Sequence, residues 1–137
     1  MADTIRKADY FSLEVEDRPG EGVRVLAKLR DAKVNLLSFT AFPAGSGKAQ
    51  ITLVPEKSDA FLAAAKGAGL APSARKECFL VQGGDRLGAV YDVLKRLAEA
   101  KINCTAANAC AAGSGSYAMV VFTKPGDVGA AAKALGI

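Results

Sequence analysis

Apolar residues recur with a helical period in two stretches of the chain, and a short β-prone run precedes each stretch. The β-prone runs cover residues 10–16 and 78–82. After them, apolar side chains return every three or four positions, at Val25, Leu26, Leu29 and Ala32 and then at Val90, Val93, Leu94, Leu97 and Ala100. This spacing predicts an amphipathic helix after each strand.

A β-hairpin is predicted after each of these helices, because apolar and polar residues then alternate on both sides of a Gly-Ser-Gly sequence. In the first half of the chain the alternation runs through Leu37 and Phe39 and returns through Ile51 and Leu53. The strand residues that we expect to lie under the helices are Phe11, Leu13, Phe39, Ile51 and Leu53 in the first half and Phe79, Val81, Ala107, Met119 and Val121 in the second. The same patterns predict two Ala-rich helices, over residues 58–68 and 127–135, and one more strand, over residues 71–77.

The two halves are copies of one another at an offset of 68 residues. Asp17-Arg18-Pro19-Gly20 returns as Asp85-Arg86-Leu87-Gly88, and the helix, the asparagine after it and the Gly-Ser-Gly turn follow in register. We therefore expect two modules, residues 1–76 and 77–137. Two repeats are too few for a solenoid, so each module should complete its core against its sister.

The ordered landmarks, a strand, a DRPG turn, a helix with VL..L spacing and a Gly-bearing hairpin, resemble the ACT domain twice over. The resemblance implies an α+β fold of two ferredoxin-like βαββαβ modules, with antiparallel sheets and helices on one face. It also implies binding of a free amino acid or another small metabolite where two modules meet. Leu87 departs from the pattern, which often has proline there.

The resemblance places ligand contacts at the turn and just after the helix, at Asp17, Arg18, Gly20 and Asn35 and at Asp85, Arg86, Gly88 and Asn103. The residue types suit a zwitterion, because a helix N-terminus attracts a carboxylate and an aspartate accepts from an ammonium group. A purely structural alternative stays open. In it the aspartates cap helices, the glycines ease a tight turn, the asparagines are C-caps and the arginines are solvated.

Composition argues against an enzyme and against a metal or cofactor protein. The chain has no histidine, which removes the commonest general base, and no serine, cysteine or lysine stands in a nucleophile motif. Its three cysteines lack metal-ligand spacing, and we expect them to be buried apolar residues in a reducing compartment. No cofactor is expected.

Nucleic-acid binding is the alternative that the net charge of +4 raises. Basic and acidic residues are mixed along the chain, which is typical of a solvated surface. An RRM-type binder shares the ferredoxin-like topology, but residues 50–54 and 118–122 lack the aromatic pattern of an RNA-binding strand. A structural assembly module without a ligand is the third alternative.

The remaining expectations concern location and assembly. No signal-like start or membrane-length apolar run occurs, so a cytoplasmic protein without membrane contact is expected. Any regulated target would be another chain. One open sheet face of the second repeat is apolar around Val120, which predicts that it is covered. The cover would be a second copy packed face to face in a homodimer or, alternatively, the first module folded over this face. Residues 4–7 precede the first strand just as residues 73–76 precede the first strand of the second repeat. Each segment is predicted to complete the sheet of the sister module, with residues 1–7 pairing with the second module.

Overall fold

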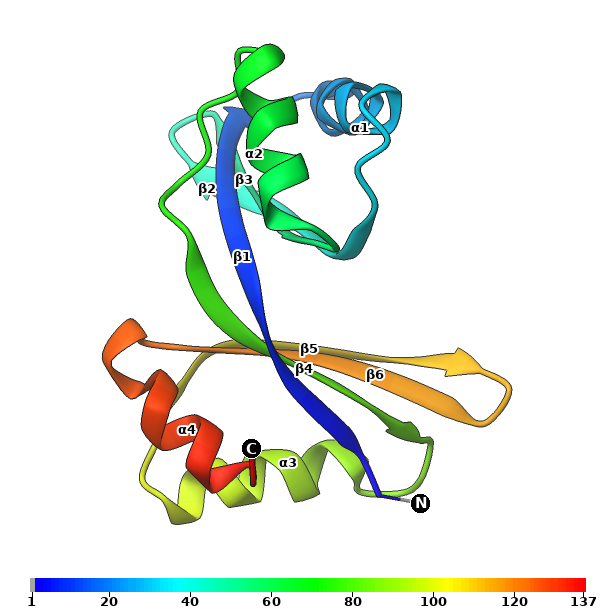
Figure 1. The fold of residues 1–137 in the computed structure, drawn as a ribbon, viewed down its shortest axis with the longest axis vertical. Coiled ribbons are helices and arrows are strands. Elements are labelled where there is room, and N and C mark those ends of the chain that lie inside the picture. Colours follow the sequence, from blue (N-terminus) through cyan, green and yellow to red (C-terminus); the bar gives the residue numbers. More distant parts are fainter. Residues whose placement is uncertain (1) are drawn as a thin grey trace. The chain divides into compact units, whose positions relative to one another are not determined.

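A computed structural model describes residues 2–137 as an α+β protein with six strands and four α-helices (Figure 1). The expected fold class is confirmed. Contacts divide the described chain into an N-terminal unit, Asp9–Lys76, and a C-terminal unit made of residues up to Ala8 together with Glu77–Ile137. The first strand, β1 (Thr4–Glu16), contributes to both units.

The N-terminal unit has the strand order β2-β3-β1, with antiparallel pairing between neighbours. Its other elements are α1 (Glu21–Asp31), β2 (Leu36–Gly45), β3 (Lys48–Pro55) and α2 (Ser58–Gly67). The prediction of a strand over residues 71–77 is wrong for residues 71–75, which belong to no strand. Ser73 donates its N–H to the Ser12 carbonyl at 2.8 Å, but its hydroxyl takes the place of a carbonyl as acceptor for the Ser12 N–H. Pro72 brings no N–H at all, so no ladder continues there.

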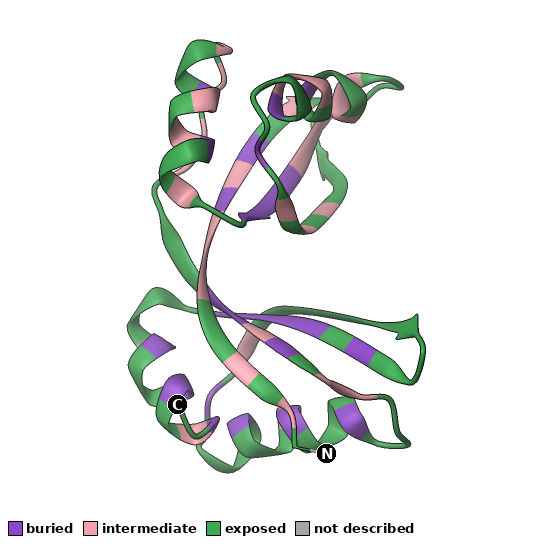
Figure 2. Ribbon diagram, turned by 45° about the vertical axis from the view of Figure 1, so that its right-hand side comes forward, coloured by how far each residue is buried: buried purple, intermediate pink, exposed green. Residues whose placement is uncertain are grey.

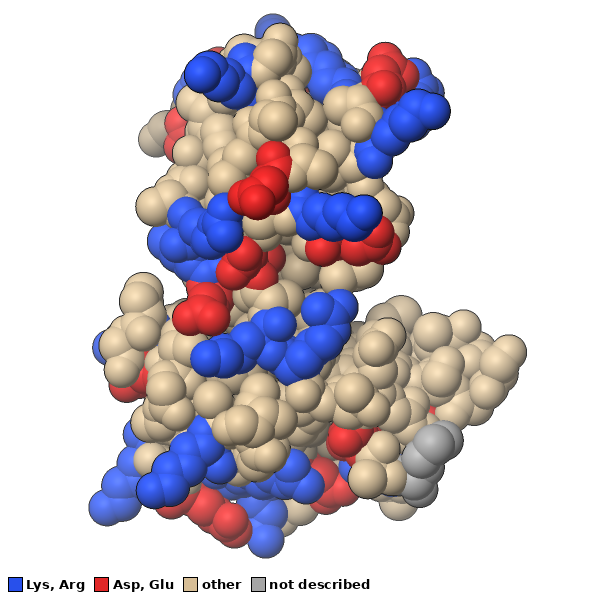
Figure 3. All heavy atoms as spheres, viewed as in Figure 1, with Lys and Arg blue, Asp and Glu red and all other residues tan. Residues whose placement is uncertain are grey.

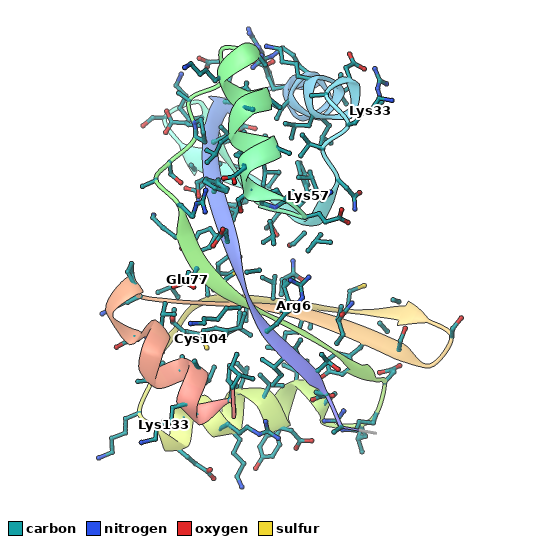
Figure 4. The ribbon with its side chains drawn as sticks, in the orientation of Figure 1. Arg6, Lys33, Lys57, Glu77, Cys104 and Lys133 are labelled. Carbon is teal, nitrogen blue, oxygen red and sulfur yellow. The ribbon has the colours of Figure 1, made fainter. Side chains whose placement is uncertain are left out.

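The C-terminal unit has the strand order β1-β4-β6-β5, in which the first residues of β1 lie beside β4. Its other elements are β4 (Lys76–Gly84), α3 (Ala89–Glu99), β5 (Cys104–Gly113), β6 (Ser116–Thr123), a 3-10 turn (Pro125–Asp127) and α4 (Val128–Ala134). Glu77 on β4, labelled in Figure 4, forms an ion pair with Lys7 at 4.0 Å. Ile5 packs against the core of the same unit.

Each unit has its own apolar core between the sheet and the two helices (Figure 2). In the N-terminal unit Phe11, on β1, stacks near Phe61, on α2, with ring centroids 4.8 Å apart. Eight strand residues expected under the helices are buried in the two cores. They are Phe11, Leu13, Ile51 and Leu53 in the N-terminal unit and Phe79, Val81, Met119 and Val121 in the C-terminal unit. The alternation of the sequence therefore identified the inner face of both sheets.

Two residues expected under the helices are exposed instead, Phe39 and Ala107. They pair with Leu53 and Val121 in the ladder, but they lie on β2 and β5, the outermost strands of their units. An outermost strand has a neighbour on one side only. Alternation predicts which face a side chain takes and does not predict how far the helices extend over it.

Under the homodimer prediction, the sheet face around Val120 was expected to be exposed in a single copy of the chain. Val120 and Phe122 are instead only 6% and 8% exposed in a single copy. Leu80 on the same face is half-buried, whereas Ala106 and Ala118 are exposed. The large apolar side chains that were expected to require a second copy as cover are therefore already buried.

All three cysteines were expected to be buried, but of these only Cys78 is buried, whereas Cys104 is half-buried and Cys110 is exposed on β5.

No helix of the described residues is long and apolar enough to cross a membrane. On the face shown in Figure 3, basic and acidic side chains are interspersed, in agreement with the mixed charge pattern of the sequence.

Candidate functional site

The repeated turn is attached to the repeated hairpin by the same hydrogen bond in both units. Asp17 donates its backbone N–H to the Gly47 carbonyl at 2.9 Å, and Asp85 donates to Gly115 at 2.9 Å. Gly47 and Gly115 belong to the Gly-Ser-Gly turns, where all three residues have positive φ. The turn after β1 or β4 is therefore fixed against the tip of the hairpin.

Gly20 and Gly88 are the N-cap residues of α1 and α3, with φ of 93° and 81°. Glycine adopts this left-handed conformation with less strain than any other residue. A Cβ added at either position would meet no atom within 4 Å, so the space beside the turn is open. Neither helix has a side-chain cap in the described chain, so Asp17 and Asp85 do not act as caps.

In the C-terminal unit Arg86 is the centre of a hydrogen-bond network. Its two terminal nitrogens donate to both carboxylate oxygens of Asp3 at 3.1 and 3.3 Å. They also donate to the Gly84 carbonyl at 3.2 Å and to Asp92 at 3.0 Å. The guanidinium carbon lies 5.9 Å from the ring centre of Tyr117, within the range of a cation–π contact.

The Asp3 carboxylate is almost fully enclosed, with its side chain 8% exposed. Tyr117 donates its hydroxyl to Asp3 at 2.9 Å. A Cβ at Gly83 would overlap a carboxylate oxygen of Asp3, so glycine is required there to admit the carboxylate. The hydrogen bond from Arg86 holds the pKa of Asp3 below its ordinary value, against the opposing effect of burial. Burial, followed by the bond to Asp3, raises the pKa of Tyr117.

Among the described residues, the N-terminal unit has no equivalent network, although it shares the turn. The Arg18 side chain forms an ion pair with Glu21 at 3.6 Å and is 68% exposed. At the offset of 68, Ala71 stands where Asp3 would be expected and Ala49 stands where the second repeat has Tyr117. The two turns therefore have the same backbone and different chemistry.

A pocket of about 260 Å³ lies beside the turn of the C-terminal unit. It is bounded by the start of α3 and by β5, and its lining includes Asp85, Arg86, Gly88 and Tyr117 together with several apolar residues. The carboxylate of Asp85 has no hydrogen bond or ion pair to the other described residues. The first N–H groups of α3 have no partner within the helix. The pocket thus combines acceptors, donors and apolar surface.

The asparagines lie at the other end of the helices and do not join the turn residues of their own unit. Helix α1 has 11 residues, so Asn35 is separated from the turn by roughly 16 Å at 1.5 Å per residue. Asn35 donates to Glu56 at 3.2 Å and borders a separate pocket of about 540 Å³. Asn103 is exposed at the equivalent place. Neither is a C-cap, because Ala32 and Ala100 are the C-caps. Lys33, labelled in Figure 4, and Lys101 then turn the chain with φ of 60° and 59°.

The Asp3–Arg86 pair predicts a pH dependence of stability. Because the pKa of Asp3 is lowered on folding from 3.8, the pair stabilises the fold above that pH, and this contribution is lost as the pH falls through the lowered pKa. The variant Asp3→Asn should therefore unfold more easily than the wild type at pH 7, and this difference should shrink as the pH falls below 3.8. Urea unfolding at several pH values measures this, and a pH-independent difference would contradict it.

Sequence reasoning identified Arg86 and the turn but missed Asp3, Asp92 and Tyr117. Asp3 and Tyr117 are 114 positions apart and belong to no motif. The signal that could have found them is the offset itself, since both positions are occupied by alanine in the other copy. Among the described residues, no group of three His, Cys, Asp or Glu side chains could hold a metal ion.

No protein-family model matches this sequence, and no curated protein matches it. Solved structures do share its fold. Protein BT0572 from Bacteroides thetaiotaomicron has a TM-score of 0.81 at 16% identity, over 96% of this chain and 88% of that one.

Regulatory subunits of aspartate kinase are similar as well. The ligand-free subunit from Thermus thermophilus has a TM-score of 0.66 at 13% identity, over 97% of this chain and 93% of that one. The subunit from Thermus flavus has a TM-score of 0.62 at 15% identity, over 98% and 93%. At such identities the likeness establishes the fold. The chain has the ferredoxin-like fold of these regulatory subunits.

Proposed function

We propose that this protein is an amino-acid-binding regulatory protein of the ACT type. The pocket of the C-terminal unit carries the proposal, because Asp85, Gly88 and the start of α3 surround one open space. An ammonium group could bind to Asp85, and a carboxylate could approach Arg86 and the adjoining helix N-terminus over a glycine that has no side chain. The shared fold with regulatory subunits of aspartate kinase is consistent with this role.

The regulatory step would act on another chain or on self-assembly, without catalysis and in the cytoplasm. A ligand can shift such an equilibrium only through its different affinity for the two states. A homodimer is part of the proposal. The surface available to a second copy includes the edge strand β5, whose residues 105–113 are all exposed and uncharged. Unpaired strand edges of this kind readily pair with another chain.

A thermal-shift screen of the twenty amino acids and a short single-stranded RNA tests the function. A ligand that binds the folded state raises the melting temperature, by an amount that grows with its concentration above the dissociation constant. We expect at least one amino acid to do so and the RNA to have no effect. A response to RNA alone would favour the RRM-type alternative. No response at all would favour a structural module.

The turn glycines supply a matched pair of variants for the amino acid that gives the largest shift. Asparagine tolerates the left-handed conformation, so Gly88→Asn should keep the backbone while it places a side chain against the pocket. We expect its affinity to fall about tenfold or more, since the loss of one charged hydrogen bond is of that order. Gly20→Asn is the control, because this pocket does not include Gly20. Calorimetry showing equal affinities for both variants and the wild type would contradict the assignment.

A further inference from the structure

Arg86 faces the pocket with most of its hydrogen-bonding capacity already in use. A guanidinium has five N–H groups, and four of them have acceptors, two on Asp3, one on Gly84 and one on Asp92. Among the described residues only the Nε–H has no acceptor. A ligand carboxylate that binds in the usual two-point manner needs two donors. It can therefore reach Arg86 only by taking the place of an existing partner.

The two carboxylates that hold Arg86 are not equally replaceable. Asp3 makes two bonds to the guanidinium, accepts a third from Tyr117 and is 8% exposed. Asp92 makes one bond and its side chain is 51% exposed. An exposed single contact contributes little, because water solvates both charges well after it breaks. Asp92 is therefore the partner whose hydrogen bond to Arg86 a ligand carboxylate can replace.

The pocket surface beyond the guanidinium is mainly apolar. Ala89, Val90, Ala109 and Ala111 contribute small hydrocarbon side chains to its lining. A short apolar chain attached to a carboxylate would cover this surface and gain free energy from leaving water. The guanidinium and the apolar lining together define a ligand with an anionic head and a short aliphatic body.

We propose that Arg86 is the carboxylate receptor of this pocket, with Asp3 as its fixed partner and Asp92 as an internal carboxylate that a ligand replaces. This inference rests on the proposed function, whose ligand it describes as a carboxylate with a short apolar chain. The exchange conserves charge at Arg86, since one carboxylate replaces another and Asp92 returns to water.

The receptor is confined to the C-terminal unit. At the offset of 68, Arg24 stands in place of Asp92 and bonds to Glu21, while Ala71 stands in place of Asp3. Arg18 thus has neither the fixed partner nor the replaceable one. Within residues 2–137, the C-terminal turn is therefore the one that has such a receptor.

Nuclear magnetic resonance titrations of the 137-residue chain test the receptor with acetate, isovalerate and ethylammonium as probes. Acetate and isovalerate should move the Arg86 Nε–H resonance, with isovalerate binding more tightly, and ethylammonium should leave it unchanged. In Asp92→Asn the internal competitor is gone, so both carboxylates should bind about threefold to fivefold more tightly. Asp92 is exposed, so this variant should fold normally.

Glu99→Gln is the matched control, because it removes one charge from an exposed ion pair, with Lys95, at the other end of α3. It should leave both affinities unchanged. Equal tightening in both variants would show a general charge effect and overturn the exchange. An Arg86 resonance that no carboxylate moves, even in Asp92→Asn, would also overturn it, whatever the amino-acid screen shows. If carboxylates bind at Arg86 but no amino acid raises the melting temperature, the carboxylate receptor is supported and the proposed amino-acid-binding function is contradicted.

Discussion

Deleting residues 1–7 is expected to destabilise the C-terminal unit on the order of 3 kcal/mol and to affect the N-terminal unit less. The deletion removes the beginning of β1, which lies beside β4, and with it the packing of Ile5. It also removes Asp3, and this leaves the hydroxyl of Tyr117 and two of the Arg86 N–H groups without their acceptor. Tyr117 is buried, and leaving a buried donor without an acceptor costs more free energy than the hydrogen bond itself contributed.

Hydrogen exchange resolved along the chain separates the two units. Amides of β4, β6 and α3 should exchange faster in the deletion variant, whereas those of β3 and α1 should change little. Asp3→Asn is the companion variant, because it weakens the contact to Arg86 and keeps the strand. Equal acceleration in both units, or acceleration in the N-terminal unit only, would contradict the prediction.

The repeat at an offset of 68 residues was the most informative feature of the sequence. It predicted the backbone correctly because that backbone depends mainly on residues that are neighbours in the chain. Turns, helix faces and hairpins depend on residues close together in the chain, so a repeated pattern predicts a repeated backbone. The structure shows this repetition in detail, down to the positive φ of Lys33 and Lys101. The fold class and the inner face of each sheet were predictable for the same reason.

The Asp3–Arg86–Tyr117 network was not predictable, because it joins residues that are 83 and 114 positions apart. Each of them has an ordinary surface interpretation when it is considered alone. The turn and the asparagines were assigned to one site by resemblance, although an 11-residue helix separates them within each unit. A family pattern gives the order of contacts along a chain, and the distances between them depend on how the elements pack.

Replacing Val120 by lysine is expected to destabilise the protein on the order of 3 kcal/mol, since an unpaired charge would be placed where the side chain is 6% exposed. Ala118→Lys is the matched control. Ala118 lies two residues away on the same face of β6 and is exposed, so its free energy of unfolding should change by about 0.5 kcal/mol or less.

The same pair of variants, measured by urea unfolding and by gel filtration with light scattering, separates folding from assembly. If a second copy covers the exposed part of this face, Ala118→Lys should weaken the dimer while the folded chain stays as stable as the wild type. If the copies meet along β5 instead, Ala118→Lys should dimerise normally, because the edge of the strand lies away from the altered side chain. A wild-type chain that is monomeric at micromolar concentration would contradict the homodimer in either form. Val120→Lys with unchanged stability would show that a charge at this position reaches water.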